Sequence, residues 1–77
     1  MRPRFVVRIG PADVGARVSV RRRIPAEPGE PGHSDVIGVL RSWEGGQVEI
    51  ERRDGVRVTV AEGDLVAGRR VPPPPSR

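Results

Sequence analysis

Hydrophobic and polar residues alternate along short stretches of this chain, and glycine or proline separates one stretch from the next. The clearest stretch is Arg17–Ile24, where Val18, Val20 and Ile24 share one face and serine and arginine side chains share the other. This period of two predicts a half-buried β-strand. Arg22 falls on the apolar face, which indicates either a β-bulge or a side chain that leaves the core at the rim of the fold.

Similar Val-rich stretches occur in the rest of the chain. They predict five further strands, at residues 5–9, 36–43, 47–53, 56–60 and 65–70. Residues 25–34 are rich in proline and glycine and hold few backbone donors for a ladder, so they predict an exposed loop. Residues 61–65 are too few for an α-helix, and their small and polar composition predicts a single 3₁₀ turn before the last strand.

The turn at Arg53, Asp54 and Gly55 is assigned from the parity of its flanking strands. A two-residue Asp54-Gly55 loop would place Ile50 opposite Thr59 and mix core positions with solvent positions. A three-residue loop with Gly55 as a left-handed bulge residue keeps the apolar positions together. It pairs Arg52 with Val56, Ile50 with Val58 and Val48 with Val60. We therefore expect the three-residue loop.

A Gly-Gly turn comes earlier in the same meander. As a two-residue loop it aligns Trp43 with Val48, but it sets the charged Arg41 opposite the apolar Ile50. A β-bulge near Leu40 and Arg41 restores the alternation on both strands, so we expect one there.

These elements together predict an all-β fold, a small SH3-like barrel of five to six short antiparallel strands with one 3₁₀ turn before the last strand. Seventy-seven residues leave room for a single domain with a thin core. We assign residues 1–71 to the barrel and residues 72–77 to a proline-rich linker, whose four consecutive prolines favour polyproline II. The alternative interpretation of that segment is a ligand for a proline-binding domain.

Composition narrows the classes of protein to consider. The formal net charge is +4, and all fourteen basic residues are arginine, a preference typical of a GC-rich coding sequence. Charged residues of both signs make up 31% of the chain, so the net charge alone is weak support for nucleic-acid binding. The chain has no cysteine for disulfides or thiolate metal sites, and it has no apolar run long enough to span a membrane. We expect a cytoplasmic monomer without membrane association.

Two motifs resemble catalytic or cofactor sites but lack the required context. Residues 10–15 have the glycine spacing of a phosphate loop, yet alanine and arginine follow where lysine and serine or threonine are needed. His33, Ser34 and Asp35 are adjacent, and neighbours in one strand or loop cannot converge as a hydrolytic triad does. We therefore predict no catalytic, metal-binding or cofactor-binding residue in this chain.

Two clusters of arginines are the strongest candidates for a binding site. They are Arg21, Arg22, Arg23, Arg52, Arg53 and Arg57. Their guanidinium groups suit phosphate contacts, but acidic residues alternate with the second group. The preferred interpretation is therefore a solvated face with local ion pairs. A nucleic-acid site is the alternative, and it is less favoured because such sites usually add aromatic side chains that stack on the bases, which are scarce here. Trp43 is predicted in the core or at the barrel rim, with a partner contact as its alternative role.

Three segments of the chain resemble one known family. They are Val-Arg-Ile-Gly-Pro-Ala-Asp-Val-Gly within residues 5–20, Asp-Val-Ile-Gly-Val-Leu-Arg-Ser-Trp at 35–43, and Leu-Val-Ala-Gly-Arg-Arg-Val-Pro-Pro at 65–73. Here the chain resembles the N-terminal SH3-like domain of actinobacterial GCN5-related N-acetyltransferases, some of which carry a histone acetyltransferase label. The resemblance implies a full-length enzyme that transfers an acetyl group from acetyl-CoA to an amine. The family's acetyl-CoA loop has no match here, so no catalytic or cofactor residue is carried over.

Three functions follow from these observations. The resemblance implies a non-catalytic accessory domain that packs on its own C-terminal catalytic domain or recruits substrate, and that carries an exposed apolar patch near Trp43. The second function is a nucleic-acid-binding barrel that uses the clustered arginines, which requires one continuous positive face. The third is a stand-alone protein-interaction adaptor.

Overall fold

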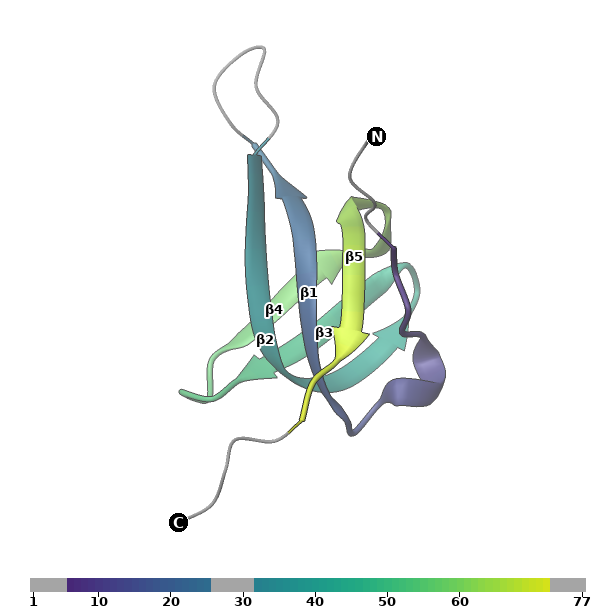
Figure 1. Cartoon of the computed structure of the whole chain (residues 1–77), viewed down its shortest axis with the longest axis vertical. Helices are drawn as coiled ribbons and strands as arrows, with labels where there is room; N and C mark the ends of the chain where they lie inside the picture. The colour runs from purple at the N-terminus through teal and green to yellow at the C-terminus, as the bar shows by residue number, and fades with distance from the viewer. Residues whose placement is uncertain (1–5, 26–31, 73–77) are drawn as a thin grey trace.

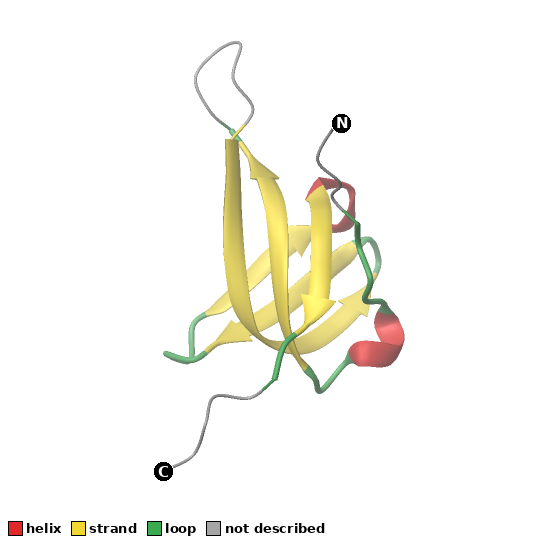
Figure 2. Cartoon of the chain, in the orientation of Figure 1, coloured by secondary structure: helices red, strands yellow, loops and turns green. Residues whose placement is uncertain are grey.

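The computed structural model describes residues 6–25 and 32–72, which form a five-stranded antiparallel sheet. The strands are β1 (Arg17–Ile24), β2 (Gly32–Glu44), β3 (Gln47–Arg52), β4 (Arg57–Ala61) and β5 (Leu65–Arg70). Their order in the sheet is β4-β3-β2-β1-β5 (Figure 1, Figure 2). The predicted all-β fold with a 3₁₀ turn before the last strand is thereby confirmed, and β1 and β5 have the predicted bounds.

The long strand β2 belongs to two layers of the sheet. Its first part pairs with β1 from Gly32 to Val39, and its second part pairs with β3 from Gly38 to Glu44. In Figure 1, β1, β5 and the upper part of β2 stand in front, while β3 and β4 cross behind them. A sheet that bends in this way encloses the apolar side chains of one face between its two layers.

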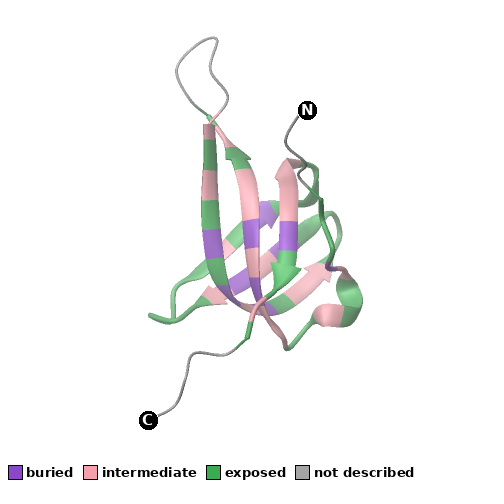
Figure 3. Ribbon diagram, viewed as in Figure 1, coloured by how far each residue is buried: buried purple, intermediate pink, exposed green. Residues whose placement is uncertain are grey.

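The core lies between these layers. Its buried apolar residues are Ile9, Val18, Val20, Val36, Leu40, Val48, Ile50 and Val60. Figure 3 shows the buried positions as short bands along the strands, with less buried positions between them. The stiff, β-branched valine and isoleucine side chains suit this pleated surface. Leu65 at the start of β5 is partly buried and packs against the cluster.

The predicted turn between β3 and β4 is confirmed. Ile50 pairs with Val58, and the Arg52 amide donates to the Val56 carbonyl at 2.8 Å across the three-residue loop. Gly55 has a φ of +88°, the left-handed conformation that this loop requires.

Two irregularities in strand pairing agree with the alternation of the sequence. The β2–β3 register shifts between Leu40 and Ser42, at the predicted bulge. The β1–β5 register shifts between Arg21 and Arg22, the point where a charged residue enters the apolar face of β1. The β2–β3 bulge lies where strict alternation would set Arg41 opposite Ile50, whereas the β1–β5 shift passes over Val66 of β5 and leaves Arg22 on the inner face of β1.

Residues 5–9 do not form the predicted first strand. Phe5 lies outside the described residues, and the segment after it makes an isolated parallel bridge between Val7 and Gly68. The buried Ile9 follows this bridge and packs over β5, where an added Cβ on Gly68 would lie 3.1 Å from the Ile9 side chain. In the described part of this segment only Ile9 is buried, and a single residue pair bridges the segment to the sheet.

The loop predicted at residues 25–34 is shorter than expected. β1 and β2 continue to pair as far as Ile24 opposite Gly32, so residues 32–34 belong to β2. The remaining residues, 26–31, lie outside the described part of the chain. The three prolines of the interval are at 25, 28 and 31, so the residues from Gly32 onward keep the amide donors that a ladder needs.

In the described part of the chain, two 3₁₀ turns accompany the strands, η1 (Pro11–Asp13) and η2 (Glu62–Asp64). η2 is the predicted turn before β5, whereas no 3₁₀ turn was predicted at η1. A proline at its first position and Gly15 with a φ of +99° after it are the local signals for η1. Within the described residues, no helix has the length and apolar character needed to cross a membrane.

Asp13 connects η1 to β5, and its contacts predict a pH dependence of stability. Its carboxylate accepts hydrogen bonds from the Gly10 amide at 2.8 Å and from Nε of Arg70 at 2.5 Å. These donors, the backbone amide first, hold the pKa of Asp13 below its usual range. A lowered folded-state pKa adds stability above the unfolded pKa of about 4, and this stability is lost as the pH falls through the folded value. We expect Asp13→Asn to lower the urea midpoint at pH 7, with a difference from the native chain that shrinks below about pH 4.

Asp64→Asn is the matched control for this experiment. The Asp64 carboxylate is half exposed and lies 3.9 Å from Arg23, so its loss is expected to change the urea midpoint little at any pH. A midpoint difference for Asp13→Asn that stays constant down to about pH 2 would show that the carboxylate charge is not the stabilising feature.

Candidate functional site

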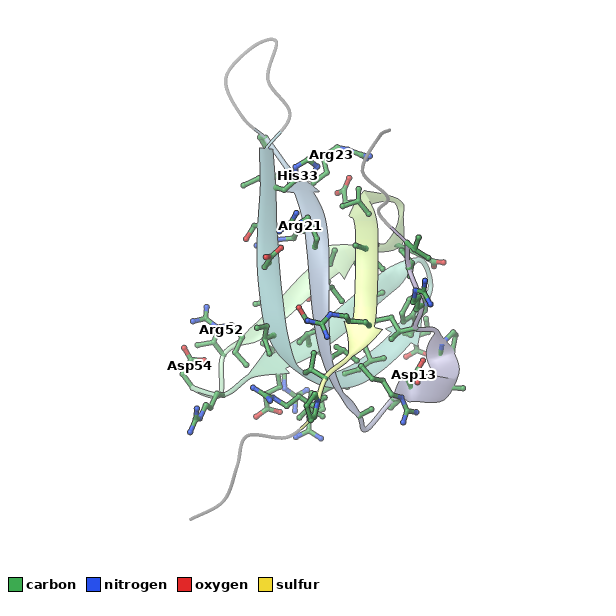
Figure 4. The ribbon with its side chains drawn as sticks, in the orientation of Figure 1. Asp13, Arg21, Arg23, His33, Arg52 and Asp54 are labelled. Atoms are coloured by element: carbon green, nitrogen blue, oxygen red, sulfur yellow. The ribbon has the colours of Figure 1, made fainter. Side chains whose placement is uncertain are left out.

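Arg21 lies on the outer face of β1 and is bound to Asp35, its cross-strand neighbour on β2. Nε and Nη2 of Arg21 donate to Oδ1 and Oδ2 of Asp35 at 2.8 and 3.1 Å. Figure 4 shows Arg21 on β1, below Arg23 and His33. This two-point hydrogen bond holds the pKa of the Asp35 carboxyl below its usual range. Both side chains remain exposed, so the contact is a surface ion pair.

Three more of the candidate arginines have carboxylate partners on the surface. Arg23 lies 3.9 Å from Asp64, Arg52 lies 3.0 Å from Asp54, and Arg57 lies 3.4 Å from Glu49 and 3.6 Å from Glu51. Arg53, in the β3–β4 turn, has no ion pair with another described residue. These contacts match the preferred interpretation of a solvated face with local ion pairs, because carboxylates interrupt the positive charge along it.

Arg22 differs from both neighbours because it follows Val18 and Val20 on the inner face of β1. Its Nε is buried and has no hydrogen-bond partner among the described residues. It lines a cleft of about 380 Å³. The other lining residues are Ser34, Asp35, Val36, Ile37, Arg52 and Val58. The structure thus brings Arg22 and Arg52 to one cleft and places Arg21 on the opposite face of β1.

A second hollow, the outer trough, lies on the outer face of β1 and β5 and measures about 410 Å³. Its lining residues are Val6, Arg8, Ser19, Arg21, Asp35, Ala67, Gly68 and Arg69. Among the described residues, neither Arg8 nor Arg69 has an ion-pair partner. These two arginines were not predicted as binding residues from the sequence. Only the pairing of β5 beside β1 and the bridge to Gly68 bring them together.

Trp43 is half-buried and packs against the core cluster, opposite Val48 as predicted. It therefore occupies the core or rim position that the sequence suggested. The exposed apolar patch expected near it is not found at Trp43 itself. Among the residues that the structure describes, the exposed large hydrophobic ones are Val6, Val7, Val14, Ile37 and Val56. Pairing within the β2–β3 hairpin directs the indole toward the core, and Ile37, at 47% exposure, is instead the apolar residue that borders the cleft.

The adjacent residues His33, Ser34 and Asp35 lie on two faces of β2. His33 and Asp35 are exposed, whereas Ser34 lies on the alternate face, so the three side chains do not converge. Within residues 6–25 and 32–72, no group of three or more His, Cys, Asp and Glu residues is placed to hold a metal ion.

Comparison with known proteins relates this sheet to a described family. A family model described as the Rv0428c N-terminal Sm-like domain matches residues 6–69. No curated protein and no solved structure matches the chain. The matched range begins with the first described residue and ends one residue before the end of β5, so it covers nearly the whole sheet.

Proposed function

Because the chain belongs to the Rv0428c N-terminal Sm-like domain family, we propose that it works as the non-catalytic N-terminal module of a longer protein. The family description assigns this type of domain to the N-terminus of Rv0428c-type proteins. The resemblance of residues 5–20, 35–43 and 65–73 to acetyltransferase N-terminal domains supports a finer proposal. In it, the following domain is a GCN5-related N-acetyltransferase, and this module packs on that domain or recruits its substrate.

The exit of the chain from the sheet is the observation that carries this proposal. The Val71 amide donates to the Arg17 carbonyl at 3.0 Å, and Nη1 of Arg17 donates to the Pro72 carbonyl at 2.7 Å. Two contacts to one β1 residue thus fix the point at which the chain leaves β5. A fixed exit suits a module that must hold a defined orientation to a domain joined by a short linker. Of the predicted linker, residues 72–77, only Pro72 belongs to the described residues.

The hollows of the domain support a binding role. The cleft and the outer trough are both open, and arginines line both of them. Surfaces of this kind suit contacts with another macromolecule, whereas small-molecule sites usually enclose most of their ligand. The proposal therefore assigns acetyl-CoA binding and acetyl transfer to the following domain.

Nucleic-acid binding is the second candidate function, and one observation favours it. Arg8 and Arg69 lie together in the outer trough without carboxylate partners among the described residues, and Arg21 borders the same hollow. Guanidinium groups in such an arrangement suit phosphodiester oxygens. An oligonucleotide is therefore included in the binding experiment described below.

The leading proposal is tested with the native gene product in two versions, complete and lacking residues 1–72. We expect the truncation to raise the KM for the acetyl acceptor about tenfold, equivalent to about 1.4 kcal/mol, and to leave the KM for acetyl-CoA unchanged. The 77-residue chain alone is expected to give no binding heat with acetyl-CoA up to about 1 mM. Steady-state kinetics and titration calorimetry are the two measurements.

Each measurement has an outcome that contradicts the proposal. A higher KM for acetyl-CoA after truncation would mean that the module contributes to the cofactor site. The mass of the native polypeptide in cell extracts is the second check. A mass equal to that of residues 1–77 would mean that no catalytic domain follows the module, and it would favour the stand-alone adaptor.

A further inference from the structure

Among the described residues, one side of β2 has no strand partner at residues 34–37. These residues pair with β1 on their other side, and pairing with β3 begins only at Gly38. This edge is the upper left border of the sheet in Figure 1. An unpaired edge presents backbone N–H and C=O groups that an extended peptide can pair with.

The cleft that Arg22 lines adjoins this edge. Four consecutive β2 residues, 34–37, line it, and Arg52 and Val58 line it from the second layer. Val36 is buried and Val58 packs against the core, so these two side chains supply an apolar wall. A strand added to β2 would direct every second side chain into this cleft.

Arg22 supplies a buried donor that no described residue uses. Its Nε is buried without a hydrogen-bond partner, whereas Arg21 and Arg23 on the outer face both have carboxylate partners. Buried polar groups in folded proteins are nearly always hydrogen-bonded, so this position suits an acceptor that arrives with a ligand. A carboxylate complements the guanidinium fork in both charge and geometry.

We propose that residues 34–37 bind an extended acidic peptide segment of a partner protein by strand addition to β2. An acidic side chain of that segment lies in the cleft between Arg22 and Arg52. Ser34 and Val36 are successive inward positions of β2. The acidic side chain therefore lies beside Ser34, and an apolar side chain two residues along lies against Val36. The inference names the partner chemistry of the interaction module, and it rests on that proposed role.

The surroundings favour a peptide over a nucleic acid at this edge. A polynucleotide gains nothing from free strand amides and carbonyls or from the wall of Val36 and Val58, whereas a peptide uses both. The described lining of the cleft includes no aromatic side chain on which a base would stack. Ile37, exposed at the rim, offers a further apolar contact to an outward-facing residue of the added strand.

The test is a titration of the isotope-labelled 77-residue chain with the blocked peptide acetyl-Thr-Val-Thr-Glu-Thr-Val-Thr-amide. We expect saturable amide shift changes centred on residues 34–37 and on Arg22. Glutamine in place of glutamate is expected to weaken binding about tenfold. Two N-methylated versions of the peptide, blocked on alternate amides, are expected to differ, because only one set of amides faces β2 in a strand pair.

Two variants of the protein locate the acidic contact. Arg22→Met is expected to weaken binding of the glutamate peptide about tenfold, whereas Arg21→Met, the same change on the neighbouring residue, changes it less than about twofold. Arg52→Met is a second variant at a half-exposed position, where folding is not at risk, and it is also expected to weaken binding. The dispersion of the amide spectrum reports whether each variant is folded.

Three results would overturn the inference. They are no shift changes at residues 34–37 up to millimolar peptide, equal binding of both N-methylated peptides, and equal losses for Arg21→Met and Arg22→Met. Stronger shifts from octathymidylate than from the peptide would also overturn it and would favour the nucleic-acid function. If the peptide does not bind but the truncation still raises the KM for the acetyl acceptor, only this inference is overturned. If the peptide binds but the truncation leaves that KM unchanged, only the proposed function is overturned.

Discussion

Gly38→Ala is expected to destabilise the fold by about 3 kcal/mol, although it adds only one methyl group. At this residue the backbone of β2 lies close against that of β3. An added Cβ would lie 2.2 Å from the Glu51 carbonyl oxygen, 2.7 Å from the carbon of that carbonyl and 3.0 Å from Cγ2 of Ile50. The first two atoms are backbone atoms of a paired strand, so the strand itself must move. A domain of this size has a total stability of about 4–12 kcal/mol, so the loss is a large share of it.

Thermal unfolding followed by circular dichroism measures this loss. The melting temperature is expected to fall by roughly 12–24 °C. Gly63→Ala in η2 is the matched control, because an added Cβ there meets no atom within 4 Å and Gly63 has no positive φ. Its effect is expected to stay within about 0.5 kcal/mol. Equal melting temperatures for the two variants would contradict the close approach of β2 and β3 at Gly38.

Ile50→Ala is expected to lower the free energy of unfolding by about 3 kcal/mol. Ile50 has no exposed surface, and it lies in β3 between Leu40 of β2 and Val58 of β4. Removing its side-chain methyls loses their transfer free energy and leaves a cavity between the two layers that a thin sheet core cannot easily close. Urea unfolding of the native chain and the variant measures the difference.

Ile37→Ala makes the same chemical change on a strand at a site that is 47% exposed. Its cost is expected to be below about 1 kcal/mol, mostly from lower strand propensity. The contrast between the two isoleucines measures the effect of burial, because both replacements remove the same atoms from a strand residue. Similar losses at positions 37 and 50 would mean that the apolar face of β3 is not the centre of the core.

Local patterns of the chain were sufficient to predict most strands and both turns of the meander. The Val-rich stretches at 17–24 and 65–70 place the ends of β1 and β5 correctly, and the parity argument at Gly55 predicts the register of β3 against β4. These features depend on residues close in sequence, where a shift of one position would move every side chain to the wrong face. The bridge at Gly68 and the extension of β2 to Gly32 depend on distant residues instead, so no local pattern predicts them.

The candidate binding residues were predicted less completely than the fold for the same reason. Arg22 was identified as an exception in β1, but its cleft requires Arg52 and Val58 from the second layer, which the bend of β2 brings near. The Arg21–Asp35 pair depends on the register of β1 against β2, and the length of loop that joins them hides that register. Arg69 alternates outward in β5, but its proximity to Arg8 depends on the bridge at Gly68.

The position of β5 beside β1 also determines when the sheet is completed during synthesis. β1 is translated before the other strands, but its neighbour on one side consists of the last residues of the sheet, 65–70. A nascent chain that has released only β1 to β4 from the ribosome therefore exposes an unpaired strand that other nascent chains can reach. Folding of the complete sheet begins only when residues 65–70 emerge, so the vulnerable interval lasts for most of the time the ribosome needs to translate the domain.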